Sequence, residues 1–307
     1  MNDKWRLPAE WEPQSAIQLT WPHQKTDWAP YLDEITETYL KLVRAIAPYE
    51  QVIIAAQEPE TVKRLVGNIP NVSIYACQND DTWARDHAFI TLVDDNGSAR
   101  LLDFRFNGWG EKFPADKDNT INRSLYEQGV FNGEYEDHND FVLEGGSIES
   151  DGKGTIYTTR CCLMAPHRNQ PLTEQQIEEE LKRRLHAEHI VWLDDEALPG
   201  DDTDGHIDTL ARILPDGSLL RLPLPDPIIE DGEQLPATYA NYLIINGAVI
   251  VPTYGQPRND QMACEKIQQA FPDRKIIPID ARTIIRQHGS IHCLTMQYPE
   301  GIVKNKK

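Results

Sequence analysis

Three observations predict an α/β fold in which helices are interleaved with sheet strands. Short apolar strands alternate with amphipathic helices along the 307 residues. This unit returns at intervals of roughly 50–60 residues, the range in which repeat architectures are found. No low-complexity linker divides the chain, so residues 1–307 are expected to form a single catalytic domain.

The first third of the chain begins with an expected strand at 15–21, followed by a helix at 31–49. The helix is predicted from an apolar stripe, because side chains three or four residues apart share one helix face. A buried strand at 51–57, a short helix at 59–67 and another strand at 71–77 follow. The residues of the stripe are Leu32, Ile35, Tyr39, Leu42 and Val43.

The same alternation continues to the end of the chain. Thr173 and Gln176 have the spacing of a capping box, which predicts a helix at 173–185. The polar stretches 105–122 and 194–206 are long enough to form lids or walls of a site. Two further helices are expected, near 120–129 and at 258–271. Strand-like stretches lie at 88–94, 99–106, 141–146, 154–159, 189–193, 206–214, 241–252, 274–280 and 290–297.

The composition is acidic and otherwise ordinary for a globular protein. The formal net charge is −19, with a hydrophobic fraction of 40%. Nucleic acid is therefore disfavoured as a partner, because phosphate binding needs clustered Lys and Arg. The acidity suits a cationic small molecule, although solubility alone would also explain it.

Nothing in the chain predicts secretion or membrane insertion. The segment "MNDKWRLPAEWEPQ" lacks the apolar core of a signal peptide, and no apolar run approaches the ~18 residues of a membrane span. The five cysteines have no disulfide-scaffold spacing. We therefore expect a cytoplasmic protein with reduced thiols; no sequence feature reports oligomeric state, and a homodimer stays open.

Four polar clusters stand out as candidate functional positions. Arg85 and Asp86 enter an expected strand, and Glu144 ends an apolar strand at a Gly-Gly turn. His206 and Asp208 are two residues apart on an expected strand, so their side chains should face the same side. Taken singly, each acid fits an ordinary surface or turn position equally well. The fourth cluster is "FRFNGWGEK" at 104–112.

A metal site is not predicted. The run "GDDTDG" fails the register of a calcium-binding loop, since no Glu occupies its twelfth position. His288, His292 and Cys293, taken with His206, suggest zinc at first sight, but the usual ligand spacings are missing. The adjacent pair at 161–162 is too close for normal disulfide geometry and is interpreted as inert thiols, and Cys264 as a core residue.

Cys293 lies inside a strand-like run, "SIHCLTMQ", and is the candidate nucleophile. Strand ends that carry His206, Asp86, Glu144 and Asp208 can converge with it on one crevice. Acids beside a thiol raise its pKa, which would be a poor arrangement for a neutral or anionic substrate. The arrangement suits a guanidinium ion, which is planar, keeps its charge, and is held by two carboxylates.

The chain resembles agmatine deiminases and the related bacterial-type peptidyl-arginine deiminases, members of the guanidino-group-modifying (pentein) superfamily. The matching motifs run in the family's order over nearly the whole chain. As a set they are specific, and "DTDGHID" and "SIHC" are the most distinctive. The motifs are "NDDTWARD" (79–86), "FRFNGWGEK" (104–112), "EGGSIESDGKGTIYTT" (144–159), "DTDGHIDTLARI" (202–213), "YGQPRNDQMA" (254–263) and "GSIHCLTMQ" (289–297).

The resemblance implies a five-bladed, pseudo-symmetric α/β propeller with its site on the central axis. It also implies roles for the five candidate residues. Cys293 would attack the guanidinium carbon, Asp86 and Asp208 would hold the guanidinium nitrogens, and His206 and Glu144 would transfer protons. No cofactor and no metal would be required.

The resemblance further places Trp83 and Trp109 at the entrance for substrate, although a core position explains these aromatic residues equally well. The chain departs from the family pattern at two places beside the site. His87 follows the Arg-Asp pair where relatives often have Thr-Gly-Pro, and His288-Gly289 stands where many have a run of glycines. Both departures bear on the shape of the pocket and therefore on the tail of the substrate.

The activity implied first is that of an agmatine deiminase, which hydrolyses agmatine to N-carbamoylputrescine and ammonia through a covalent amidino-cysteine, a step in putrescine (polyamine) synthesis. Alternatives with the same chemistry are deimination of arginine or peptidyl-arginine. Amidino transfer to an amine is a third enzymatic alternative. A catalytically inactive pentein that only binds its ligand is the non-enzymatic one.

Overall fold

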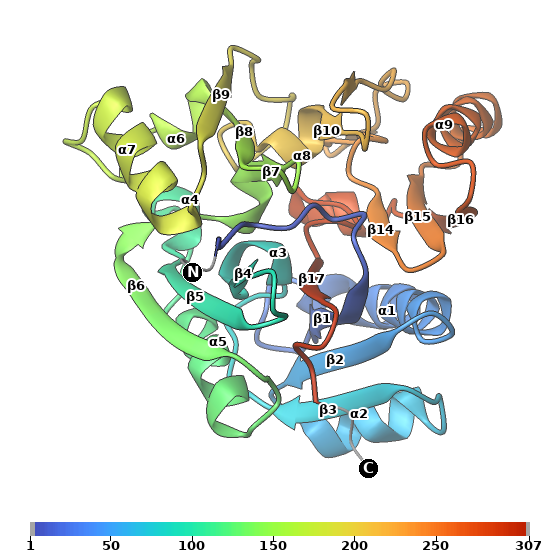
Figure 1. The fold of residues 1–307 in the computed structure, drawn as a ribbon. Helices are drawn as coiled ribbons and strands as arrows, with labels where there is room; N and C mark the ends of the chain where they lie inside the picture. The colour runs from blue at the N-terminus through green and yellow to red at the C-terminus, as the bar shows by residue number, and fades with distance from the viewer. Residues whose placement is uncertain (1–3, 305–307) are drawn as a thin grey trace.

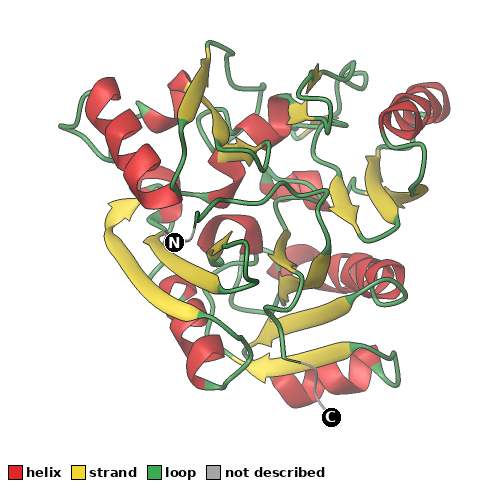
Figure 2. Ribbon diagram, in the orientation of Figure 1, coloured by secondary structure: helices red, strands yellow, loops and turns green. Residues whose placement is uncertain are grey.

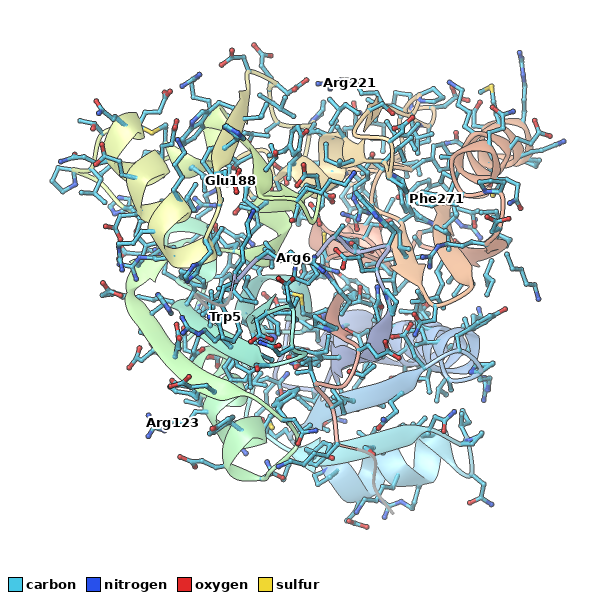
Figure 3. All side chains as sticks on the ribbon, in the orientation of Figure 1. Trp5, Arg6, Arg123, Glu188, Arg221 and Phe271 are labelled. Atoms are coloured by element: carbon cyan, nitrogen blue, oxygen red, sulfur yellow. The ribbon has the colours of Figure 1, made fainter. Side chains whose placement is uncertain are left out.

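The protein has a mixed α/β fold, seen in a computed structural model that describes residues 4–304. Small sheets lie around the middle of the molecule, where the short helix α3 (Ala84–His87) is found, and the longer helices lie on the outside (Figures 1 and 2). The N-terminal segment crosses the middle of the view before it enters the first strand (Figure 1). Figure 3 shows Arg6 of this segment near the middle and Arg123, Arg221 and Phe271 toward the periphery.

One four-stranded sheet joins the two ends of the chain. Its order is β17-β1-β2-β3. The strands β1, β2 and β3 are parallel and are connected by helices, whereas β17 pairs antiparallel with β1. The elements are β1 (Gln14–Thr20), α1 (Leu32–Ile46), β2 (Gln51–Ala56), α2 (Pro59–Val66), β3 (Val72–Ala76) and β17 (Thr295–Pro299).

Three three-stranded sheets share one plan, which accounts for the recurrence seen in the sequence. In each, the first two strands form an antiparallel hairpin, and a helix then leads to a third strand parallel to the second. The first contains β4 (Ile90–Val93), β5 (Ala99–Arg105), α5 (Asp118–Glu127) and β6 (Glu134–Val142); the second contains β7 (Ile148–Ser150), β8 (Thr155–Thr159), α7 (Glu174–Leu185) and β9 (His189–Leu193); the third contains β14 (Leu243–Ile245), β15 (Ala248–Thr253), α9 (Pro257–Ala270) and β16 (Lys275–Asp280).

The remaining elements are short. Two pairs of two-residue strands lie between the second and third of these sheets along the chain. One-turn helices follow several strands and carry side chains toward the middle of the molecule. These elements are η1 (Ala29–Tyr31), α4 (Gly108–Glu111), η2 (Gly145–Ser147), α6 (Arg160–Leu163), α8 (Ile207–Leu210), β10 (Arg212–Ile213), β11 (Leu219–Leu220), β12 (Ile229–Glu230), β13 (Glu233–Gln234) and η3 (Ile284–Gln287).

The helices bury the faces that the sequence predicts. Ile35, Tyr39, Leu42 and Val43 of the α1 stripe are fully buried in the largest core cluster, and Leu32 packs against its edge. Each buried aliphatic or aromatic side chain of this kind contributes roughly 1.5–3 kcal/mol to stability. The capping box that begins α7 is present, with the Thr173 hydroxyl accepting from the Gln176 backbone N–H.

Three local predictions around the candidate residues were wrong. Asp86 lies on the one-turn helix α3 and not at the entry of a strand. His206 is the residue before α8, and Asp208 lies on that helix, so strand alternation does not orient them. Cys293 lies in a turn just before β17. In each case the segment has four residues, which is too short to show a helical period. The neighbouring apolar residues therefore give a strand-like sequence pattern.

The polar stretch 105–122 is also more ordered than predicted, since it contains α4 and the start of α5. The stretch 194–206 has no helix or strand. Between residues 4 and 304, no helix combines the length and the apolar character needed to cross a membrane.

Glu50 gives the fold a pH-dependent stability. Its side chain is 6% exposed, and one carboxylate oxygen accepts from the Asn246 backbone N–H at 3.0 Å, linking the first sheet to the β14–β15 hairpin. The other oxygen has no hydrogen-bond partner among the described residues. Burial raises the pKa of Glu50 from 4.5 to about 7, so folding favours the protonated form.

We predict that Glu50→Gln stabilises the protein at pH 8. In the wild type the stability conferred by neutral Glu50 is complete below about pH 4.5 and is lost as the pH rises through about 7. An amide removes this loss, so the free energy of unfolding at pH 8 should rise by about 1–3 kcal/mol and the difference should vanish near pH 4.5. Urea unfolding at the two pH values measures it, with exposed Glu196→Gln as the matched control. Equal stability of E50Q and wild type at pH 8 would contradict the prediction.

Candidate active site

A cavity of about 420 Å³, including its open mouth, contains the candidate nucleophile. Cys293 and Asp86 lie in its wall, together with Trp83 and Trp109. A larger cavity of about 650 Å³ lies along residues 7–14 but is lined by neither Cys293 nor Asp86. The smaller cavity is therefore the one that brings a thiol and carboxylates together.

The turn before β17 presents Cys293 to the cavity and fixes it by backbone contacts. The Arg85 N–H donates to the Cys293 carbonyl at 3.1 Å. The Asn241 side chain contacts Cys293 twice, accepting from its backbone N–H and donating to its sulfur, both at 3.2 Å. Burial, with the charges of Asp208 and Asp86, raises the pKa of the Cys293 thiol well above its usual value. With the cavity empty, the sulfur is therefore a neutral thiol.

Asp86 is oriented by two donors. One carboxylate oxygen accepts from the Gly146 backbone N–H at 2.9 Å, and the other accepts from the Trp109 indole N–H at 3.0 Å. Burial raises the pKa of Asp86 to about 6, against the opposing effect of His206. A positive guest in the cavity would favour the ionised form.

Asp208 lies 3.7 Å from the Cys293 sulfur through one oxygen, Oδ2. The same oxygen accepts from His292 Nδ1 at 2.7 Å, and His292 Nε2 in turn contacts Glu10 at 2.7 Å. The other oxygen, Oδ1, has no hydrogen-bond partner among the described residues. Burial acts to raise the pKa of Asp208, but interactions with His292 and other nearby positive groups lower it overall, so Asp208 is a buried carboxylate.

His206 lies between two carboxylates. Its Nδ1 is 3.7 Å from Asp86, and its Nε2 is 3.8 Å from Glu144 Oε2. Burial alone would lower the pKa of His206, but the surrounding acids raise it well above its usual value. The Arg168 guanidinium donates to Glu144 Oε1 at 2.9 Å and, with His206, outweighs burial, so the pKa of Glu144 is lowered. This arrangement favours a protonated imidazole beside an ionised carboxylate.

Glycines give the site its close spacing. A Cβ on Gly146 would lie 2.6 Å from His206 Nδ1 and 2.9 Å from Asp86 Oδ1, and one on Gly289 would lie 2.1 Å from the Trp83 ring. Contacts this short do not occur in folded proteins, so neither position admits a side chain without displacing the site. Gly289 is thus required even though the longer run of glycines is missing from this chain.

The mouth of the cavity is acidic and aromatic. Asp27 is exposed, and Asp81 and Asp202 are partly buried in the lining, beside the Trp83 and Trp109 rings. His288 also lines it, and its Nδ1 contacts the Gly200 carbonyl at 2.7 Å. No Lys or Arg lines this cavity among the described residues.

The structure therefore brings all five candidate residues into one connected set, and it adds others that the sequence did not single out. His87, the other departure from the family pattern, is buried and contacts the Thr20 hydroxyl at 3.1 Å, and it does not line the cavity. Cys161 and Cys162 form no disulfide, and Cys162 lies beside His206 and Glu144. The added residues are Glu10, Arg168, Arg212 and Asn241. His292, which the sequence analysis considered only as a zinc ligand, also belongs to the set through its contact with Asp208.

Arg212 forms the centre of a second buried cluster behind Asp208. Its guanidinium pairs with Glu10 at 2.6 Å, and with Glu149. His292 connects this cluster to Asp208. The motif "DTDGHIDTLARI" contains Arg212, which is the one sequence signal that could have found it.

The fold is related to the pentein fold, and it places a thiol and a carboxylate in the wall of one small cavity, with an imidazole 3.7 Å from that carboxylate. The chain belongs to the Porphyromonas-type peptidyl-arginine deiminase family, whose sequence model matches residues 6–221 and 216–299. A dimethylarginine dimethylaminohydrolase has a related fold, with a TM-score of 0.52 at 16% identity over 93% of this chain and 100% of that chain.

Individual relatives match almost the full chain. A protein from Marinomonas sp. (strain MWYL1) named "Putative agmatine deiminase" is 31% identical over 97% of this chain and 95% of its own length. A cysteine-to-serine variant of C. jejuni agmatine deiminase, solved with substrate bound, has a TM-score of 0.91 at 34% identity, over 97% of each chain. The structure named "Putative Arginine Deiminase from Porphyromonas gingivalis" has a TM-score of 0.91 at 40% identity, over 98% of this chain and 100% of that chain.

We predict that Gly146→Ala lowers kcat/KM for a guanidine substrate by at least about 100-fold, a loss of roughly 2.7 kcal/mol of transition-state stabilisation. The added methyl displaces the His206 ring and the Asp86 carboxylate, which it would otherwise approach within 3 Å. Steady-state assays of ureido product measure the loss. Thermal unfolding reports whether the variant is folded; a folded G146A variant within tenfold of wild-type activity would show that this spacing is not required.

Proposed function

We propose that this protein is an agmatine deiminase, an iminohydrolase that converts agmatine and water to N-carbamoylputrescine and ammonia. One observation carries the proposal: no Lys or Arg in residues 4–304 forms an ion pair with Asp86 or Asp208, although both are buried beside the Cys293 thiol. The other buried acids of this region are paired with arginine, Glu144 with Arg168 and Glu10 with Arg212. Two buried carboxylates that have no Lys or Arg partner and lie beside one thiol are suited to a cation that enters from outside.

The guanidinium would lie between the two aspartates. The free oxygen of Asp208 and the second lone pairs of both Asp86 oxygens are available to its N–H groups. Holding the planar ion in this way would place its central carbon in front of Cys293, and fixed orientation contributes several kcal/mol to lowering a barrier. Its positive charge would also offset the acids that raise the pKa of the thiol.

The proposed reaction has two stages. The Cys293 thiolate attacks the guanidinium carbon, protonated His206 gives a proton to one nitrogen, and the C–N bond breaks to release ammonia. The carbon stays bound to sulfur as an amidino-cysteine. Water then gives a proton to His206, which Glu144 supports, and attacks the same carbon. The C–S bond breaks, the ureido product leaves, and Cys293 returns to its thiol form. Side chains of this protein and water thus account for every atom and proton transferred in the reaction.

The mouth of the cavity favours agmatine over free arginine. Agmatine ends in an ammonium group, which Asp81 and Asp202 would attract, whereas the carboxylate of arginine would meet acids and no lining Lys or Arg. Agmatine is also the substrate in the names of the C. jejuni and Marinomonas relatives. Trp83 and Trp109 would pack against the alkyl chain between the two charged ends.

Arginine and peptidyl-arginine remain the second candidates. The P. gingivalis structure at 40% identity carries an arginine deiminase name, and the family description names peptidyl-arginine. A catalytically inactive binding protein fits less well, because the nucleophile, the imidazole and all three acids are present and close together.

We also propose that the fold is a five-bladed propeller with the site on its axis, because sheets of one plan lie around a common middle. Contacts of Glu10 with Arg212 and His292 support one catalytic unit over residues 1–307. Unpaired cysteines suit the reducing cytoplasm. We further propose that the protein is a homodimer, which sedimentation of the purified protein would test.

We predict that Cys293→Ser abolishes turnover of agmatine, because a hydroxyl in this acidic cavity is a far weaker nucleophile than a thiolate. Acid-quenched wild-type reactions should carry, on the peptide containing Cys293, the mass of the substrate less ammonia. Cys264→Ser, on the outer helix α9, is the matched control and should keep wild-type activity. Full activity of C293S, or an adduct on another cysteine, would refute the proposed nucleophile.

We predict that kcat/KM for agmatine exceeds that for arginine and for a peptide with C-terminal arginine by at least about tenfold, or ~1.4 kcal/mol. In Asp202→Asn the ratio should fall, mainly through KM for agmatine, because the attraction for the distal ammonium is weakened. Ureido product is measured for each substrate with both proteins. A preference for arginine would identify the alternative substrate while leaving the proposed chemistry in place.

A further inference from the structure

A second cysteine lies beside the proton-transfer pair. Cys162 on α6, His206 before α8 and Glu144 before η2 are each completely buried. One donor atom from each, a sulfur, a ring nitrogen and a carboxylate oxygen, lies within 4.8 Å of the other two. The proposed deimination uses His206 and Glu144 but gives Cys162 no part.

The donor atoms in this cluster are unusually free. Glu144 Oε2 and both His206 ring nitrogens have no hydrogen-bond partner among the described residues, although they are buried. An unsatisfied buried polar atom is energetically unfavourable, so a group able to bind these atoms would be stabilised here. Arg168 holds the other oxygen of Glu144 and leaves Oε2 directed at His206 Nε2, 3.8 Å away.

We propose that Cys162, His206 and Glu144 form a reversible Zn²⁺ site, with water as the fourth ligand. A thiolate, an imidazole nitrogen and a carboxylate oxygen are the three donor types that zinc takes in proteins. Zinc distances of about 2.0–2.2 Å to nitrogen and oxygen place two tetrahedral ligand atoms roughly 3.3–3.5 Å apart. The Nε2–Oε2 separation of 3.8 Å would have to shorten by a few tenths of an ångström on binding. On binding, the Cys162 thiol and the protonated His206 imidazole each release a proton to solvent, and no oxidant or reductant takes part.

The contacts around the cluster also suit a metal. Arg168 orients Glu144, and Asp86 faces the second nitrogen of His206, the arrangement by which an outer carboxylate fixes a metal-bound imidazole. Asp86 also lies in the wall of the substrate cavity, so the route that lets a guanidine approach His206 would admit the ion.

Zinc bound here would stop catalysis without touching the nucleophile. It would occupy His206 Nε2 and Glu144 Oε2, the groups that move protons in both stages. This consequence rests on the proposed deiminase function, whereas binding of the ion does not. The alternative thiol is Cys293, which lies against Asp208 and would require a different set of ligands.

Titration of the chelator-treated, full-length protein with Co²⁺, a coloured substitute for zinc, tests the site. We expect one equivalent to give a thiolate-to-cobalt absorption band, displaced by Zn²⁺, in wild type and in Cys293→Ala. Cys162→Ala should lose the band and bind Zn²⁺ at least about 100-fold more weakly. Cys161→Ala, whose sulfur instead contacts the Asp195 carbonyl at 3.1 Å, is the matched control and should keep both properties.

A band that survives in C162A and disappears in C293A would overturn the assignment, as would the absence of any band in wild type. In enzyme assays, each variant is compared with its own metal-free rate. The zinc concentration for half-inhibition should rise at least about 100-fold in C162A and stay unchanged in C161A. If the protein has no deiminase activity, the cobalt band still decides the metal site, so the two proposals fail separately.

Discussion

The proposed site depends on two buried carboxylates, Asp86 and Asp208, that lie beside the Cys293 thiol and have no Lys or Arg partner within residues 4–304. Removing a carboxylate from water costs several kcal/mol unless another charge or good hydrogen bonds offset it. The protein supplies only part of that compensation, through Gly146 and Trp109 for Asp86 and through His292 for Asp208. A bound cation would supply the remainder, which is the basis of the proposed guanidinium site.

The scaffold keeps this unfavourable arrangement in place by drawing on distant parts of the chain. Asp86 is oriented by the backbone of residue 146, and Asp208 is connected through His292 to Glu10 in the N-terminal segment. Antiparallel pairing of β17 with β1 joins the two ends of the chain beside the site. Contacts spanning this much sequence form only in the folded protein. The unfavourable free energy of bringing the acids together is therefore offset by core packing elsewhere.

The sequence predicted the parts of the molecule that local chemistry determines. Apolar runs and helical stripes located the strands and the longer helices. The five candidate residues, which the structure brings close together, were predicted from residue type and motif. The one-turn helices that carry Asp86 and Asp208 were missed, because four residues show no period. His292 and Glu10 were missed as partners because their pairing spans 282 residues, and no local pattern reports it. The position of Cys162 beside His206 and Glu144 was missed for the same reason, since these neighbours are distant in sequence.

A thiol with a raised pKa is consistent with a nucleophilic role, and it bears on selectivity. Without a guest, Cys293 stays protonated and resists alkylation and oxidation, which act on thiolates. A neutral molecule that entered the cavity would leave the charges of Asp86 and Asp208 uncompensated and the sulfur unreactive. In the proposed mechanism, a guanidinium ion would satisfy the carboxylates and, by the same charge, favour the thiolate that attacks it. Selection would then act on the reactivity of the sulfur as well as on binding, and the binding energy of the cation would be used to lower the barrier.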